Sequence, residues 1–571
     1  MTIKPKWAWF SAFTAVFAVL AVFVFWGAWA LDKVPVMPDC PTSFAVDYVE
    51  DWIRGWNQSG KFVPSDIIAF LGSPYFWVEL RYVLAIYCAA LGMAYFLRGR
   101  GLSRLASYGA GLLLAFSGYW LTLFSAGHLG WFIWMTYGVF AFGLVDRALA
   151  KGKVRHWLSL GACLAWGSFH QPDLWLLFTV FTAAYFVFRY VTLARHAQDA
   201  TGVARWLPRR WLKGAAIALA SFVVIGLPSF RSAIFSDLAG RDKQIEEGQT
   251  VGGDVKDDAE KRWLFVTNWS MPPEDTVEFF KARAHGDTSC PMTLAIGQYR
   301  GNGIKPYTGR LGRPKDAPSG NYRQHSLYVG WATCILALFG VLTALGVRRR
   351  QSTAVEGSRG TILFFLISGI VFYVFSLGRF CEPVYRLVYA LPLGDYLRAP
   401  VKWHHLTEFC IVVLAGFGID GLLKAACATK KKAPVILAAL FILFGAFDLA
   451  VEAHRFCAPH NADTQIAPFT QYPIPADPAL ESKFADAVRK RGFNPVGKSE
   501  MTFQLADGSL KQMQVFWVEQ KVPRPKVRDA GKTLGDGAYF MAVASVLATG
   551  LVCGFLLVCV FNKRLGAMRV G

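Results

Sequence analysis

The sequence predicts an all-α polytopic membrane protein with about twelve transmembrane helices, and three observations support this fold class. Of the 571 residues, 54% are hydrophobic, and they are concentrated in long blocks. Many aromatic residues lie near the block ends, where amphipathic rings favour the membrane interface. Much of the net charge of +21 lies in short connections between blocks, which is a property of membrane topology rather than of nucleic-acid binding.

Each predicted helix is an apolar block of roughly 20 residues, the length that crosses a bilayer. The first block follows Lys4 and Lys6, is long for a signal-peptide core and lacks a clear small-residue cleavage site. We therefore interpret it as a retained helix. In chain order, the predicted helices cover residues 7–31, 76–97, 106–126, 131–149, 156–169, 174–192, 213–229, 326–347, 361–379, 405–424, 433–452 and 536–562.

The basic residues test this assignment. When the N-terminus is placed in the cytoplasm, each short connection predicted inside is basic, as the positive-inside rule requires. We therefore predict a bacterial inner-membrane protein with both termini in the cytoplasm. The inside connections contain Arg98, Arg100 and Arg104; Lys151, Lys153 and Arg155; Arg205, Arg209, Arg210 and Lys213; Arg348, Arg349 and Arg350; and Lys430, Lys431 and Lys432.

This topology divides the chain into membrane and extracytoplasmic parts. The first transmembrane part has its own outer loop at 32–75, and the second has an outer loop at 380–404. The five parts in order are residues 1–229 (transmembrane), 230–325 (extracytoplasmic insert), 326–452 (transmembrane), 453–535 (extracytoplasmic segment) and 536–571 (last helix and cytoplasmic tail).

The outer segments are expected to form small α+β structures. The stretch from Met513 to Val518 has a weak strand pattern, and the proline-rich stretch from Pro468 to Pro478 is typical of an irregular lead-in. The four outer segments contain one cysteine each, and an even number of thiols in an oxidising compartment suggests disulfides. Four free thiols are the alternative, and both remain open for Cys40, Cys290, Cys381 and Cys457.

Two carboxylates in the first outer loop are candidates for chemistry. Asp47 and Asp51 are four residues apart in a stretch with helical spacing, so they share one face of a short helix that would lie on the membrane. A carboxylate there could act as a general base for a sugar acceptor, or could bind a divalent ion that holds a lipid phosphate. An ordinary solvated helix face is the alternative.

Histidines and cations lie at other junctions predicted outside. His128 and the pair His170 and Gln171 lie at consecutive outer helix junctions, where they could line one cavity or be hydrogen-bonded packing groups. Close to Pro400, a cationic cluster could hold a phosphate or pyrophosphate, or its side chains could snorkel to the interface. That cluster consists of Arg398, Lys402, His404 and His405.

Several classes of protein are disfavoured by what the sequence lacks. It contains no Walker loop, dinucleotide fingerprint, nucleophile elbow or zinc-type cysteine pair in a working context. An ATP-driven pump is therefore not expected. A cytoplasmic nucleotide-sugar enzyme is not expected either, because no soluble domain of any size is predicted inside.

The order of motifs in the outer segments resembles the YfhO-like bacterial membrane proteins over residues 1–455. The motifs, called the landmark segments below, are Ser125–His128 (SAGH), Phe169–Gln171 (FHQ), Thr267–Asp275 (TNWSMPPED), Leu327–Gly330 (LYVG) and Tyr396–Pro400 (YLRAP), the last of which precedes a helix that ends in Gly416–Asp420 (GFGID). That family is similar to the GT-C glycosyltransferases, which take a sugar from a polyprenyl-phosphate donor on the extracytoplasmic side.

The resemblance implies a GT-C-like fold and an envelope glycosyltransferase. Its partners would be a polyprenyl-phosphate-linked sugar donor, an envelope glycan or lipid acceptor and membrane lipids, without nucleic acid. No cofactor is required by the resemblance, and a divalent cation is one option. Asp47 is the best match to the essential acidic residue and Asp51 is second. The substrate-binding candidates are His128, His170, Gln171, Trp269, Glu274, Arg398, Lys402 and His404.

Two functions of other classes remain as alternatives. About twelve helices also suit a multi-pass transporter or lipid flippase. Against this class, the sequence shows no internal repeat and no paired helices broken by glycine or proline, and it has a long outer insert. A non-catalytic envelope assembly protein is the other alternative.

Overall fold

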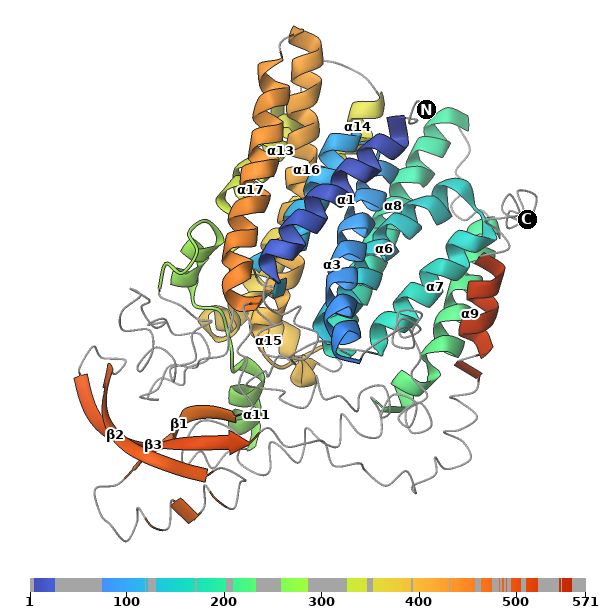
Figure 1. Cartoon of the computed structure of the whole chain (residues 1–571). Helices are drawn as coiled ribbons and strands as arrows, with labels where there is room; N and C mark the ends of the chain where they lie inside the picture. Colours follow the sequence, from blue (N-terminus) through green and yellow to red (C-terminus); the bar gives the residue numbers. More distant parts are fainter. Residues whose placement is uncertain are drawn as a thin grey trace.

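A helical bundle with a small sheet at one end forms the described part of the chain (Figure 1). The structure is a computed structural model. It describes residues 5–25, 74–118, 120–121, 130–169, 172–201, 209–232, 258–285, 326–346, 353–391, 394–430, 432–457, 464–474, 482, 485–486, 489, 494–504, 510–521, 544–545 and 547–556.

Each of the twelve apolar blocks predicted from the sequence contains described helix. In the first half of the chain, the helices are α1 (Pro5–Val24), α3 (Pro74–Gly99), α4 (Arg104–Ala115), α6 (Gly130–Lys151), α7 (Val154–Ser168), α8 (Pro172–Thr201) and α9 (Arg209–Ser232). The second half contains α11 (Asp258–Thr267), η3 (Pro273–Phe279), α13 (Trp331–Gly346), α14 (Thr353–Ser376), η4 (Gly378–Cys381), α15 (Glu382–Tyr389), η5 (Gly394–Tyr396), η6 (Pro400–Trp403), α16 (His404–Thr429), α17 (Ala433–Cys457) and an apolar helix at Leu547–Leu556.

Six of the described helices are long and apolar enough to cross a membrane. Three shorter apolar helices, Ala8–Val24, Trp331–Leu345 and Leu547–Leu556, accompany them. The chain is therefore a multi-pass membrane protein, and the count of about twelve spans stays a prediction. The six candidate spans are Tyr82–Gly99, Asp173–Arg195, Trp211–Phe230, Arg359–Ser376, Pro400–Thr429 and Ala433–His454.

Helix α16 lies at the centre of the bundle and packs against α4, α13, α14 and α17. Its crossing with α13 is close because glycines face backbone there. A Cβ added at Gly418 would lie 1.8 Å from the carbonyl oxygen of Leu336, and one added at Gly340 would lie 2.3 Å from that of Leu414. Small residues allow helices in a membrane to approach in this way.

Two helices are shorter than predicted. The helix expected over 106–126 ends at Ala115, where the N–H of Gly118 donates to the carbonyl of Tyr328 at 2.9 Å instead of continuing a helical ladder. The helix expected over 326–347 begins at Trp331, because Gly330 has a φ of 94° that interrupts a right-handed helix. Tertiary hydrogen bonds therefore replace helical ones at this junction.

The two ends of the bundle differ. The N-terminus and the turn between α16 and α17 lie at one end, called the N-terminal end below (Figure 1). Helices α11 and α15 and the sheet lie at the opposite end, called the α15 end. The predicted division into transmembrane and extracytoplasmic parts, and with it the assignment of the α15 end to the extracytoplasmic side, stays a prediction.

The sheet has three antiparallel strands in the order β1-β3-β2. These are β1 (Thr464–Ile474), β2 (Asn494–Gln504) and β3 (Leu510–Lys521). The strand pattern at Met513 to Val518 lies within β3. The irregular lead-in predicted from Pro468 is wrong as far as Ile474, since these residues belong to β1. As an edge strand with a register irregularity after Phe469, β1 tolerates prolines.

Candidate functional site at the α15 end of the bundle

The structure describes half of the candidate residues. Asp47, Asp51, His128, His170 and Gln171 lie outside the described residues, and their roles stay predictions. Trp269, Glu274, Arg398, Lys402 and His404 are described, and all five belong to the connected segments at the α15 end.

Two residues with left-handed backbone conformation bring the landmark segments at 267–275 and 396–400 together. Trp269 and Ala399 both have a φ of 66°, a conformation that costs non-glycine residues about 1–3 kcal/mol and persists where the surroundings determine it. The N–H of Val401 donates to the carbonyl of Trp269 at 3.1 Å, and the N–H of Ala399 donates to that of Val266 at 3.0 Å. Backbone hydrogen bonds therefore hold the segment before α16 against the segment after α11.

Lys402 connects this assembly to α8. Its ammonium forms an ion pair with the carboxylate of Asp173, and the two side chains are 14% and 7% exposed. The other carboxylate oxygen of Asp173 accepts from the N–H of Leu174 at 2.9 Å, at the start of α8, where the helix dipole favours a negative charge. The pair therefore fixes a lysine ammonium among segments from distant parts of the chain.

Arg398 turns toward a different element. Its guanidinium carbon lies 4.6 Å from the centre of the Phe265 ring in α11, in the geometry of a cation–π interaction. Arg398 and Lys402, which the sequence groups in one cationic cluster, thus contact α11 and α8 respectively.

The first turns of α16 place two histidines and a glutamate in the interior. The His404 ring lies against Phe279 with centroids 4.6 Å apart, and the His405 ring lies 4.7 Å from that of Trp120. One turn further, the buried Glu408 accepts a hydrogen bond from the hydroxyl of Ser117. The α15 end of α16 therefore carries ionisable side chains in the interior of the bundle.

The Trp269 segment is fixed to the end of α14. The N–H of Met271 donates to the carbonyl of Ser376 at 2.9 Å, and the N–H of Arg379 donates to the hydroxyl oxygen of Ser270 at 2.9 Å. The guanidinium of Arg379 donates to the carbonyl of Thr267 at 2.9 Å and 3.2 Å, and burial lowers its pKa. These contacts leave little freedom to the backbone around Trp269.

Glu274 lies next to two buried carboxylates that the sequence reasoning missed. Glu274 itself is exposed, whereas Asp275 and Glu278 are buried. His285 returns to this turn: its Nε2 lies 3.1 Å from the carbonyl oxygen of Glu274 and its backbone N–H donates to Glu278 at 3.3 Å. The sequence signal for Asp275 is its place in the landmark segment 267–275. From that segment the sequence analysis selects only Trp269 and Glu274 as candidates.

Three landmark segments share one hydrophobic cluster. Residues of 267–275, 327–330 and the chain beside 396–400 pack together, and the N–H of Val329 donates to the carbonyl of Phe279 at 3.3 Å. Through Lys402 and Asp173, the start of α8, which follows the landmark at 169–171 in the sequence, joins them. The cluster, called the landmark cluster below, consists of Trp269, Met271, Phe279, Leu327, Val329 and Val401.

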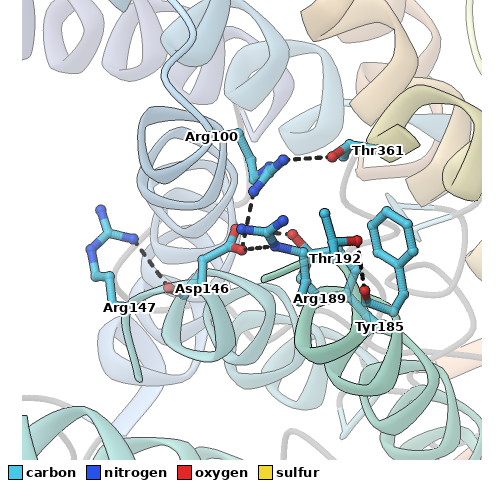
Figure 2. A network of polar contacts seen from close by, with 9 residues as sticks. Arg100, Asp146, Arg147, Tyr185, Arg189, Thr192 and Thr361 are labelled. Atoms are coloured by element: carbon cyan, nitrogen blue, oxygen red, sulfur yellow. Dashed lines mark hydrogen bonds and ion pairs between the residues drawn. The ribbon is translucent and has the colours of Figure 1, made fainter. Parts of the chain in front are cut away.

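A second polar network, missed by the sequence reasoning, joins the C-terminal ends of α3 and α6 (Figure 2). Asp146 of α6 accepts hydrogen bonds from Nε of Arg189 at 2.6 Å, from the hydroxyl of Tyr185 at 2.9 Å and from Arg100 at 3.4 Å. Arg100 also donates to the hydroxyl oxygen of Thr361 at 2.6 Å. The network joins α3, α6, α8 and α14, so its geometry is that of a clamp between helices.

Signals for the missed residues were present in the sequence. Asp146, Arg189 and Glu408 each lie inside a predicted apolar block, and ionisable residues at such positions are rare and mark sites or internal pairs. In the part of the chain that the structure describes, no group of three or more His, Cys, Asp or Glu residues is placed to hold a metal ion.

The disulfide prediction is tested at one cysteine. Cys381 at the end of η4 carries a free thiol. Cys40 and Cys290 lie outside the described residues, and only the backbone of Cys457 is described. A disulfide that includes Cys381 is therefore not present.

Comparison with known proteins gives little guidance. No protein-family model matches the chain, and no curated protein matches it. The chain is similar to ArnT from Cupriavidus metallidurans, solved by crystallography in the apo state, with 13% sequence identity and a TM-score of 0.23 over 90% of this chain and 98% of that chain. A likeness of this degree carries no argument about function, so the proposals below rest on the residues.

Proposed function

We propose that the chain is a membrane glycosyltransferase that moves a sugar from a polyprenyl-phosphate donor to an envelope glycan, lipid or polymer on the extracytoplasmic face. The observation that carries this proposal is the landmark cluster. Segments that resemble the YfhO-like family, and through it the GT-C enzymes, are far apart in sequence, yet they contact one another at one end of a membrane-spanning bundle.

Lys402 is the side chain with the clearest role in this proposal. A sugar that leaves a polyprenyl phosphate leaves a negative charge behind, and a fixed cation at a low-dielectric boundary stabilises that charge. Lys402 begins a candidate span and is held by Asp173 with both side chains largely buried. The lipid phosphate would share the ammonium with Asp173, while Arg398 would contribute from the same segment.

The remaining candidates would act on the sugar and the acceptor. Asp47 would remove the proton of the acceptor hydroxyl, with Asp51 as the second candidate. The exposed Glu274 would contact the sugar beside the landmark cluster, and Trp269, which is 3% exposed within that cluster, would form the wall against which the sugar lies. His404 would support the wall of the site through its contact with Phe279.

The test compares envelope glycans and polyprenyl-linked sugars between the deletion strain and strains that carry single variants. Lys402→Met and Asp47→Asn are expected to reproduce the deletion, with a missing envelope sugar and accumulated lipid-linked donor. Lys402→Arg should retain part of the transfer because it keeps the positive charge. Lys424→Met is the matched control, since Lys424 lies on the same helix with a side chain that is 72% exposed.

The outcomes separate the proposal from its alternatives. Unchanged glycans in the deletion strain would refute an envelope glycosyltransferase. Donor that accumulates only on the cytoplasmic face would instead indicate a flippase. If the deletion strain loses the glycan but the Lys402→Met and Asp47→Asn strains keep it, the protein would be a non-catalytic assembly protein.

A further inference from the structure

The connection between α14 and α16 contains a short amphipathic helix whose two faces differ sharply. On the inner face of α15, Tyr385 is fully buried and Val388 is 3% exposed. On the outer face, Leu387 is 70% exposed, and Leu391, one turn further along, is 60% exposed. Leu391 lies two residues past the end of α15, where its N–H donates to the carbonyl of Val388 at 3.2 Å and so continues the last turn of the helix. These two exposed leucines are called the Leu387 patch below.

The inner face of α15 is fixed, which determines where the Leu387 patch points. The hydroxyl of Tyr385 donates to the carbonyl of Leu397 at 3.3 Å. Gly394 passes so close that a Cβ there would lie 2.0 Å from the carbonyl oxygen of Val388. A rotation of α15 that buried the leucines would break both contacts, so their exposure is a property of the packed structure.

The position of α15 along the chain places it at the membrane surface. The preceding candidate span ends at Ser376 and the following one begins at Pro400. Helix α15 covers Glu382–Tyr389 between these points. The chain therefore leaves the bilayer shortly before α15 and enters it again shortly after. A helix so constrained lies near the boundary between headgroups and acyl chains.

The flank of α15 has the chemistry of that boundary. The guanidinium of Arg386 lies 4.4 Å from the centre of the Trp263 ring and pairs with Glu382 at 2.7 Å. The rings of Trp263 and Tyr389 meet edge to face with centroids 5.4 Å apart. Tryptophan, tyrosine and arginine prefer the headgroup level, where one part of the side chain is apolar and another is hydrated.

We propose that α15 is an interfacial helix that inserts the Leu387 patch among the acyl chains of the bilayer leaflet at the α15 end. Arg386 and the aromatic flank then lie among the headgroups, and the lipid surface holds the segment that leads into Lys402. The amphipathic geometry, with leucines on one face and a charged and aromatic flank, is that of helices that lie in the membrane plane. This inference does not depend on the proposed glycosyl transfer.

The test is site-specific photo-crosslinking of the full chain in vesicles of phosphatidylethanolamine and phosphatidylglycerol. p-Benzoylphenylalanine replaces one residue at a time, and mass spectrometry measures lipid adducts after illumination. The positive control is Ile367, which is 59% exposed on the spanning helix α14. The negative control is Asp486, whose side chain is 61% exposed in the chain between β1 and β2.

Lipid adducts at Leu387 and Leu391 are expected at a yield close to that of Ile367 and several times that of Asp486. Both positions are exposed, so the folded protein should tolerate the probe, and each variant is checked by size-exclusion chromatography before illumination. Yields equal to that of Asp486 would overturn the proposal. Crosslinks from both positions to another segment of this chain, or to a second copy, would overturn it as well and would identify what covers the patch.

Discussion

Replacing Asp146 with asparagine removes the negative charge from the clamp between α3, α6, α8 and α14 while keeping the shape of the side chain. Arg100 and Arg189, each with a side chain that is 9% exposed, would then remain buried without their shared carboxylate. Removing one partner of a buried ion pair costs about 3–5 kcal/mol, because the remaining charge is left uncompensated. We take about 3 kcal/mol, since the amide oxygen can still accept a hydrogen bond.

The assay is thermal unfolding of the detergent-solubilised protein. A change of 1 kcal/mol shifts the Tm by about 2–4 °C in domains of 150–250 residues, and by less in larger proteins. The Asp146→Asn variant should therefore unfold a few degrees, at most about 6 °C, below the wild type. Arg147→Met is the matched control, because the Arg147 guanidinium stacks 3.3 Å from the centre of the Tyr95 ring and donates to the carbonyl of Gly143 at 3.2 Å rather than to Asp146. Its loss should cost only about 1 kcal/mol.

A double variant tests whether the clamp acts as a unit. Arg189→Gln should cost less in the Asp146→Asn background than in the wild type, because its main partner is already neutral and contacting residues are not additive. A Tm for Asp146→Asn that equals that of Arg147→Met would refute the reasoning. Additive effects in the double variant would refute it as well.

Three further predictions concern packing, capping and topology. Gly418→Ala should destabilise the bundle by at least about 2 kcal/mol, because the new Cβ would lie 1.8 Å from a carbonyl of α13, whereas Gly550→Ala meets open space and should be neutral in the same thermal assay. Ser103→Ala should cost about 1 kcal/mol, since its hydroxyl caps the first turn of α4 at 3.3 Å. Reporter fusions at Gly253 and Gly508 should give extracytoplasmic signals, and cytoplasmic signals at either position would contradict the twelve-span topology.

Part of the candidate site was accessible from the sequence. Lys402, Trp269 and Glu274 were selected from motifs, and the structure places all three in connected segments at the α15 end. Their partners were not accessible. Asp173 lies one residue before the helix predicted over 174–192, and its pairing with Lys402 depends on how α8 packs beside the segment before α16.

The positions of buried charge show the same division. The sequence places Asp146 and Glu408 inside apolar blocks, which is enough to mark them as unusual. It does not say that Asp146 meets two arginines or that Glu408 meets Ser117. These pairings follow from the rotation of each helix about its axis, and that rotation is set by the packing of all its neighbours.

The sequence by itself determined that this chain is a multi-pass membrane protein and where its helices lie, because long apolar blocks are local properties and the bilayer requires each one to satisfy its own backbone hydrogen bonds. Tertiary structure decided that one helix ends early, at Ala115, and that another begins late, at Trp331. Hydrogen bonds between distant segments replace the helical ones there. It also decided that the landmark segments meet around Trp269 and that the Leu387 patch faces outward. Such contacts join residues far apart in the chain, and only the packed bundle brings them within reach.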